Sequence, residues 1–67
     1  MTVTILYTNY RNETSERRIL PRRIWFGKNE WHAEPQWLMD ALDLDKDAER
    51  TFAIAMIHSW RKASELS

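Results

Sequence analysis

The sequence predicts a mainly β fold, a small barrel of about four to five strands with a short helical segment near the C-terminus. Two observations lead to this prediction. The first half of the chain contains two extended stretches separated by a polar turn, as in a β-hairpin. In the second half, Trp37-Leu38-Met39 precedes an acidic turn and then Arg50-Thr51-Phe52. This order indicates one strand pair of a small β-barrel module rather than the active site of an enzyme.

The first strand is predicted over residues 2–8. This stretch is rich in β-branched and aromatic residues, and alternation places Val3, Ile5 and Tyr7 on one face. Residues 9–15 then supply the asparagine, serine and threonine side chains that are typical of a turn. The N-terminal part of the chain is therefore expected to form a hairpin.

The second strand is predicted over residues 16–26, where an extended pattern resumes. Proline cannot donate a hydrogen bond to a β-ladder, so Pro21 indicates an edge position, a bulge or a bend. Gly27 is the only glycine, and we expect it to end the strand with a positive φ or a tight turn.

The second half of the chain fits two secondary structures. Pro35 suits the first turn of a helix, and residues 37–42 carry apolar side chains at helical spacing. The same spacing recurs between Phe52 and Ala63. Local periodicity alone therefore leaves an α+β alternative, in which an N-terminal hairpin is followed by two helices.

The order of four sequence segments decides between strands and helices in the second half of the chain. They are the first strand ending in Tyr7, residues 16–24, Trp37-Leu38-Met39 with Ala41 and Asp43, and residues 50–54. In this order they resemble the WYL-domain family, and the resemblance covers residues 3–57. It implies a Sm-like or SH3-like β-barrel, in which residues 36–57 form two strands joined by residues 45–48 and the helical segment is limited to residues 57–65.

The chain also departs from the family pattern. Leu38 stands at the position of the family's tyrosine, Met39 at that of its leucine, and Met56 at that of a basic residue. The helix-turn-helix that such modules usually follow in bacterial transcription regulators is absent from these residues. We therefore expect a stand-alone module or a partner subunit.

Size and composition limit the organisation of the chain. With 67 residues it has room for one domain, residues 1–67, and one modest core. Such small cores are usually supplemented by disulfides, metals or a partner subunit, and the chain has no cysteine. Its four tryptophans favour dense packing or self-association, so we expect a homodimer.

The location follows from missing signals. The N-terminus has neither a basic start nor the apolar run of a signal peptide. No stretch approaches the ~18 consecutive apolar residues that a transmembrane helix needs. We expect a cytoplasmic protein that does not enter the membrane.

Charge is segregated along a chain whose net charge is zero. Residues 11–28 carry six basic and two acidic side chains, whereas residues 29–49 carry one basic and seven acidic. This segregation predicts one positive and one negative face, for contacts with an anionic ligand or with a second copy.

Arginines are the first candidates for ligand binding. Arg17, Arg18, Arg22 and Arg23 lie close together, and a guanidinium group can bind two phosphate oxygens at once. On a regular strand Arg17 and Arg23 would share one face, and Arg18 and Arg22 the other. The alternative is a solvated edge strand whose arginines pair with the acidic segment. The family resemblance implies that the arginines contact a nucleotide or nucleic acid and adds Arg50 to the set.

Aromatic side chains are the second candidates. Trp31 and Trp37 lie near the basic groups in sequence, and aromatic platforms beside arginines bind single-stranded nucleic acid on small barrels. Trp31 is flanked by charged residues and is expected to be the more exposed. The alternative is that the tryptophans belong to the core or to a dimer interface.

No catalytic or metal-binding pattern is present. Asp43, Asp45 and Asp47 resemble a calcium loop, but Ala48 and Ile54 occupy the positions where such a loop needs glycine and glutamate. The two histidines lack partners at ligand spacing, and a single glycine excludes a glycine-rich phosphate loop. We therefore expect neither an enzyme nor a bound metal or cofactor.

These observations predict a small binding or regulatory module. It would recognise a nucleotide or single-stranded nucleic acid through its arginine-rich strand. The alternative is a module for protein–protein interaction or self-assembly that has no nucleic-acid ligand.

Overall fold

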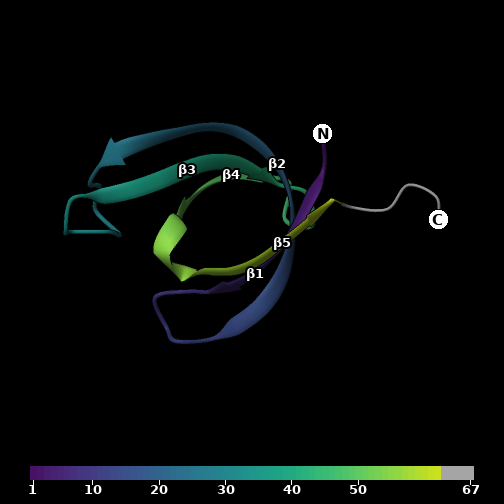
Figure 1. Ribbon diagram of the computed structural model, residues 1–67, viewed down its shortest axis with the longest axis horizontal. Helices are drawn as coiled ribbons and strands as arrows, with labels where there is room; N and C mark the ends of the chain where they lie inside the picture. Colours follow the sequence, from purple (N-terminus) through teal and green to yellow (C-terminus); the bar gives the residue numbers. More distant parts are fainter. Residues whose placement is uncertain (63–67) are drawn as a thin grey trace.

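The chain forms a curled, five-stranded antiparallel sheet (Figure 1). The structure is a computed structural model that describes residues 1–62. Its elements are β1 (Val3–Thr8), β2 (Thr14–Gly27), β3 (Gln36–Asp43), β4 (Ala48–Ala53), the 3₁₀-helix η1 (Ile54–Met56) and β5 (Ile57–Lys62). The mainly β fold predicted from the sequence is confirmed.

The strands are arranged in the order β4-β3-β2-β1-β5. The short helix η1 carries the chain from β4, at one edge, to β5, at the other (Figure 1). No hydrogen-bonded ladder joins β4 to β5 within residues 1–62, so the sheet curls without closing into a barrel. No helix in this part of the chain is long and apolar enough to cross a membrane.

The helical interpretations of the second half are wrong. Residues 36–43 and 48–53 are strands, as the family resemblance implies, and their connection overlaps the predicted residues 45–48. The predicted C-terminal helical segment is a strand over Ile57–Lys62, and its remaining residues, 63–65, lie outside the described residues. A few residues of helical periodicity cannot sustain a helix when a neighbouring strand offers a complete ladder.

A bulge interrupts β2 beside its proline. Pro21 pairs with Ala41 and Arg23 pairs with Asp40, so Arg22 is an extra residue without a partner on β3. Of the three possibilities predicted for Pro21, an edge position, a bulge or a bend, the bulge is therefore confirmed. One extra residue reverses the alternation of faces along the rest of the strand.

The turns depend on residues other than the glycine. Asn12 and Asp47 have positive φ values of 65° and 52°, whereas Gly27 does not have a positive φ, contrary to our expectation. A Cβ atom on Gly27 would lie 2.6 Å from the ring of Trp25. A side chain at this position would therefore require the Trp25 ring to move.

The core lies inside the curl of the sheet. Its buried cluster comes from four of the strands and consists of Ile5, Tyr7, Ile19, Met39, Ala41 and Phe52. Tyr7 and Phe52 pack edge to face with their ring centroids 4.8 Å apart. The Tyr7 hydroxyl accepts a hydrogen bond of 3.0 Å from the Ala53 N–H, which ties β1 to β4 across the interior. No tryptophan belongs to this cluster; Trp31, Trp37 and Trp60 are exposed, whereas Trp25 is partly buried.

Candidate ligand-binding pocket

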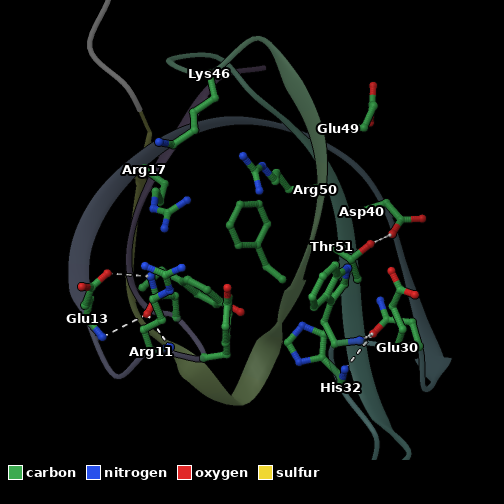
Figure 2. A pocket seen from close by; sticks show the side chains of 16 residues that line it. Arg11, Glu13, Arg17, Glu30, His32, Asp40, Lys46, Glu49, Arg50 and Thr51 are labelled. Carbon is green, nitrogen blue, oxygen red and sulfur yellow. Dashed lines mark hydrogen bonds between the residues drawn. The ribbon is translucent and has the colours of Figure 1, made fainter.

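An open pocket of about 1060 Å³ lies beside the core. Its walls come from the β1–β2 turn, the β2–β3 loop and β4, and it extends across the edge of the sheet to Asp40 and Glu49 (Figure 2). Tyr7 and Phe52, from the buried cluster, form part of its lining. The site thus has part of the buried core as its base and turns at its margin.

Three cationic side chains lie on the same side of this pocket. Figure 2 shows Arg17 of β2, Lys46 of the β3–β4 turn and Arg50 of β4 in this position. Arg50 pairs with Ala41 across the ladder and therefore shares its core-facing side of the sheet. Neither Arg50 nor Lys46 makes an ion pair within residues 1–62. Their charges are available to an anion.

A buried carboxylate holds Arg17 in place. Arg17 Nη1 lies 3.3 Å from Oδ2 of Asp43, whose side chain is 0% exposed, whereas that of Arg17 is 17% exposed. The guanidinium also lies 6.0 Å from the ring centroid of Tyr7. Asp43 Oδ1 accepts hydrogen bonds from the backbone N–H groups of Asp45 and Lys46, at 3.1 and 3.2 Å. One buried side chain therefore orders both Arg17 and the turn that carries Lys46.

Two aromatic side chains meet across two loops of the pocket. The rings of Tyr10 and Trp31 are stacked, with centroids 6.1 Å apart and an interplanar angle of 30°. Asn9 Oδ1 accepts hydrogen bonds from the backbone N–H groups of Arg11 and Glu13, and Asn29 Oδ1 accepts them from the N–H groups of Trp31 and His32. An asparagine thus stabilises each of the loops that carry the aromatic rings.

Carboxylates also line the pocket, at Glu13, Glu30, Asp40 and Glu49. Two of them are neutralised, because Asp40 pairs with Arg23 and Glu49 pairs with Arg22. The hydrogen bond from Arg23 is the main cause that lowers the pKa of Asp40 below its ordinary value of 3.8. Glu13 and Glu30 make no ion pair among the described residues.

The structure brings together three of the predicted site residues and separates the other four. Arg17, Arg50 and Trp31 line the pocket. Trp37 does not; it packs edge to face against Phe26 with centroids 5.3 Å apart.

The remaining three arginines are engaged on the other face of β2. Arg18 pairs with Asp45, Arg22 with Glu49 and Arg23 with Asp40, at 2.8, 3.0 and 2.9 Å. The alternative that the arginines pair with the acidic segment is confirmed. Its premise of an edge strand is wrong, since β2 is the central strand. These ion pairs place part of the basic segment directly beside the acidic segment.

Sequence reasoning missed the pocket residues Tyr10, Arg11, His32 and Lys46. A signal for the aromatic pair existed, because Asn9 directly precedes Tyr10 and Asn29 precedes Trp31 by two residues. Asparagine in such a turn accepts hydrogen bonds from the backbone about two residues further on and so fixes the turn. No cluster of three or more His, Cys, Asp or Glu side chains with the geometry of a metal site occurs within residues 1–62.

No protein-family model matches the chain, and no curated protein or solved structure matches it either.

Proposed function

We propose that this protein is a cytoplasmic, non-catalytic binding module that recognises an anionic ligand, a nucleotide or single-stranded nucleic acid, in the pocket beside its core. The observation that carries the proposal is that Arg17, Lys46 and Arg50 line one pocket together with the exposed Trp31.

The cations of the pocket suit a phosphate group. A guanidinium can donate two parallel hydrogen bonds to phosphate oxygens, and such charge-assisted bonds are stronger than neutral ones. Arg17 uses Nη1 for Asp43 and Nε for Ser15, which leaves further N–H groups for a ligand. Because Asp43 already orders Arg17, little conformational entropy is lost when the ligand binds.

The family resemblance supports the same ligand chemistry. Arg50 stands at the arginine position of the WYL pattern, and the order of strands with a short helix before the last one is consistent with an Sm-like or SH3-like fold. The departures at Leu38 and Met39 remove no pocket contact, because both side chains are buried outside the pocket lining.

A titration of a fluorescently labelled single-stranded oligonucleotide, followed by anisotropy, tests the proposal. We expect binding at low salt that weakens as salt is added, since phosphate contacts release counterions. Arg50→Ala should weaken binding about tenfold or more, the usual effect of losing one charge-assisted hydrogen bond.

Arg18→Ala is the matched control, because Arg18 carries the same charge on the same sheet but is paired with Asp45 outside the pocket. Equal losses for the two variants would show that the pocket has no special role. Absence of binding at low salt, both to the oligonucleotide and to free nucleotides, would refute the proposal.

A second candidate function is self-assembly. On the core-facing side of the β2–β3 end, Ile24, Phe26 and Trp37 are 58%, 58% and 56% exposed, and Phe26 pairs directly with Trp37. Contiguous apolar side chains on a small protein favour an interface, and a second copy would supply the core that so short a chain lacks. Light scattering should then show a homodimer that Phe26→Asp converts to a monomer. A wild-type monomer at high micromolar concentration would contradict it.

A further inference from the structure

We infer that the pocket takes a single nucleotide rather than a nucleic-acid strand, with the base stacked on Trp31 and the phosphates on Arg17, Lys46 and Arg50. This inference rests on the proposed function and adds the size and the orientation of the ligand.

The two sides of the pocket carry different groups, apart from Arg11, which lies 5.7 Å from the ring centroid of Tyr10 on the aromatic side. Figure 2 shows Arg17, Lys46 and Arg50 on one side, and His32 and Glu30 of the β2–β3 loop across the pocket from them. Trp31 belongs to that loop. A nucleotide has the same polarity, with charged phosphates at one end and a flat base at the other.

The aromatic end is prepared for stacking. Trp31 is 63% exposed although its ring already stacks with that of Tyr10, so part of its surface remains accessible to a ligand. Two backbone hydrogen bonds to Asn29 and a pair of backbone bonds between Asn29 and His32 hold the loop. A base that stacks on this ring needs no rearrangement of the backbone, and such a contact contributes about 1–3 kcal/mol.

The distribution of free charge argues against a strand. The chain has ten lysines and arginines, and five of them make ion pairs within residues 1–62. Three of the five that do not, Arg11, Lys46 and Arg50, line the pocket. A nucleic-acid strand needs a continuous basic track for its successive phosphates. Outside the pocket the arginines of β2 are neutralised by carboxylates, so such a track is absent from the described residues.

The margin of the pocket also disfavours a strand. Glu13 of the β1–β2 turn and Glu30 of the β2–β3 loop line the pocket without forming an ion pair in residues 1–62. A strand that continued past the pocket would bring further phosphates near these carboxylates, which repel them. A ligand that ends inside the pocket avoids this cost. The volume of about 1060 Å³ lies slightly above the usual range of about 300–1,000 Å³ for small-molecule sites.

Calorimetric titrations with three kinds of probe test the inference. The probes are nucleoside diphosphates with each of the four common RNA bases, inorganic pyrophosphate, and single-stranded oligonucleotides of about 6 and about 12 nucleotides, lengths within the usual site sizes for single strands. We expect at least one diphosphate to bind about tenfold or more tightly than pyrophosphate, since only the nucleotide gains a stacking contact. We expect the oligonucleotides to bind no more tightly than that diphosphate, whatever their length.

Trp31→Ala locates the base. Because Trp31 is exposed, this variant should fold, and it should lose about tenfold in nucleotide affinity while its affinity for pyrophosphate stays the same. Trp37→Ala, which removes an exposed tryptophan outside the pocket, should change neither affinity.

The outcomes separate this inference from the proposed function. Equal affinities for pyrophosphate and all four diphosphates would overturn the stacking inference and leave an anion site. Affinity that rises with oligonucleotide length would overturn the single-nucleotide inference in favour of a strand. If none of the probes binds at low salt, both the proposed function and this inference fail.

Discussion

The inner and outer faces of β2 carry the same type of side chain in two different situations. Arg17 lies on the face of the buried cluster, is mostly covered, and pairs with the fully buried Asp43. Arg18, Arg22 and Arg23 are exposed and pair with carboxylates on neighbouring segments. The difference between them shows that the face of the strand, and not the residue type, decides whether an arginine can serve a pocket.

The bulge at Arg22 creates part of this difference. Arg17 pairs with Ile5 and so shares the face of the core, whereas Arg23 pairs with Asp40, which neighbours the core residue Met39 and points the other way. A regular strand would place Arg17 and Arg23 on the same face. The prediction that they share a face is wrong because one inserted residue reverses the alternation.

The largest effect is expected on the inner face. Asp43→Ala removes the partner of Arg17 and two hydrogen bonds to the β3–β4 turn. Loss of one member of a buried ion pair should lower the free energy of unfolding by about 3 kcal/mol. Urea denaturation measures this change. Asp45→Ala, which removes the exposed partner of Arg18, is the control and should leave the urea midpoint almost unchanged. Similar losses in both variants would remove the distinction between the two faces.

A second effect is expected at Tyr7, which lies beneath Arg17. Tyr7→Phe leaves the buried N–H of Ala53 without its acceptor, which should cost about 1–2 kcal/mol in the free energy of unfolding. Thermal denaturation at neutral pH measures the loss. A variant as stable as the wild type would show that this bond between β1 and β4 contributes nothing.

The same tyrosine should produce a pH dependence. Burial raises the pKa of Tyr7 above its ordinary value of 10.0, while the Ala53 hydrogen bond and Arg17 act in the opposite direction. Because the folded pKa is above that of the unfolded chain, the stability that the neutral phenol provides is complete below pH 10.0 and is lost as pH rises through the folded pKa. The wild type should therefore lose stability above that pH more steeply than Tyr7→Phe. Parallel profiles would contradict this.

A smaller effect is expected for Arg23→Ala on the outer face. Arg23 pairs with Asp40 and lies 5.4 Å from the ring centroid of Trp25. Because its side chain is solvent-exposed, the loss should stay below about 1 kcal/mol. Arg23 lowers the pKa of Asp40, so the contribution of the pair is present above the ordinary pKa of 3.8 and is lost as pH falls through the lower folded value. Urea midpoints at neutral pH and at a pH well below 3.8 should thus differ less in the variant than in the wild type. If the urea midpoint changed with pH by the same amount in the variant and the wild type, Arg23 would not be the group that lowers the pKa of Asp40.

The smallest effect is expected for Arg18→Ala. Both Arg18 and Asp45 are exposed, so water and salt screen their attraction. We expect no measurable change in the urea midpoint. A clear loss of stability that disappears in high salt would show that the outer ion pairs act as a coupled network, which would weaken the contrast between the faces.

Part of the fold and of the site could be predicted from the sequence. The alternation from Val3 to Tyr7 predicted the first strand and its buried face, and Pro21 was correctly associated with an irregularity in the second. Arg17, Arg50 and Trp31 were correctly grouped, although the structure supports their common location only and their role stays a prediction. Trp37, Arg18, Arg22 and Arg23 were grouped with them because proximity in sequence does not specify the side of a sheet.

By itself, the sequence determined the extended character of the first half and the positions of the turns, since β-branched alternation and asparagine-rich turns act over a few residues. The tertiary structure decided the rest. Residues 57–62 became a strand because β1 offered a free edge, and the Trp25 ring occupies the space that a side chain at Gly27 would need. Arg17 lies toward the pocket, where it pairs with Asp43. Asp43 is buried on β3 and is the ladder partner of the core residue Ile19. Each of these results depends on contacts that the fold creates, whose free energies local patterns do not contain.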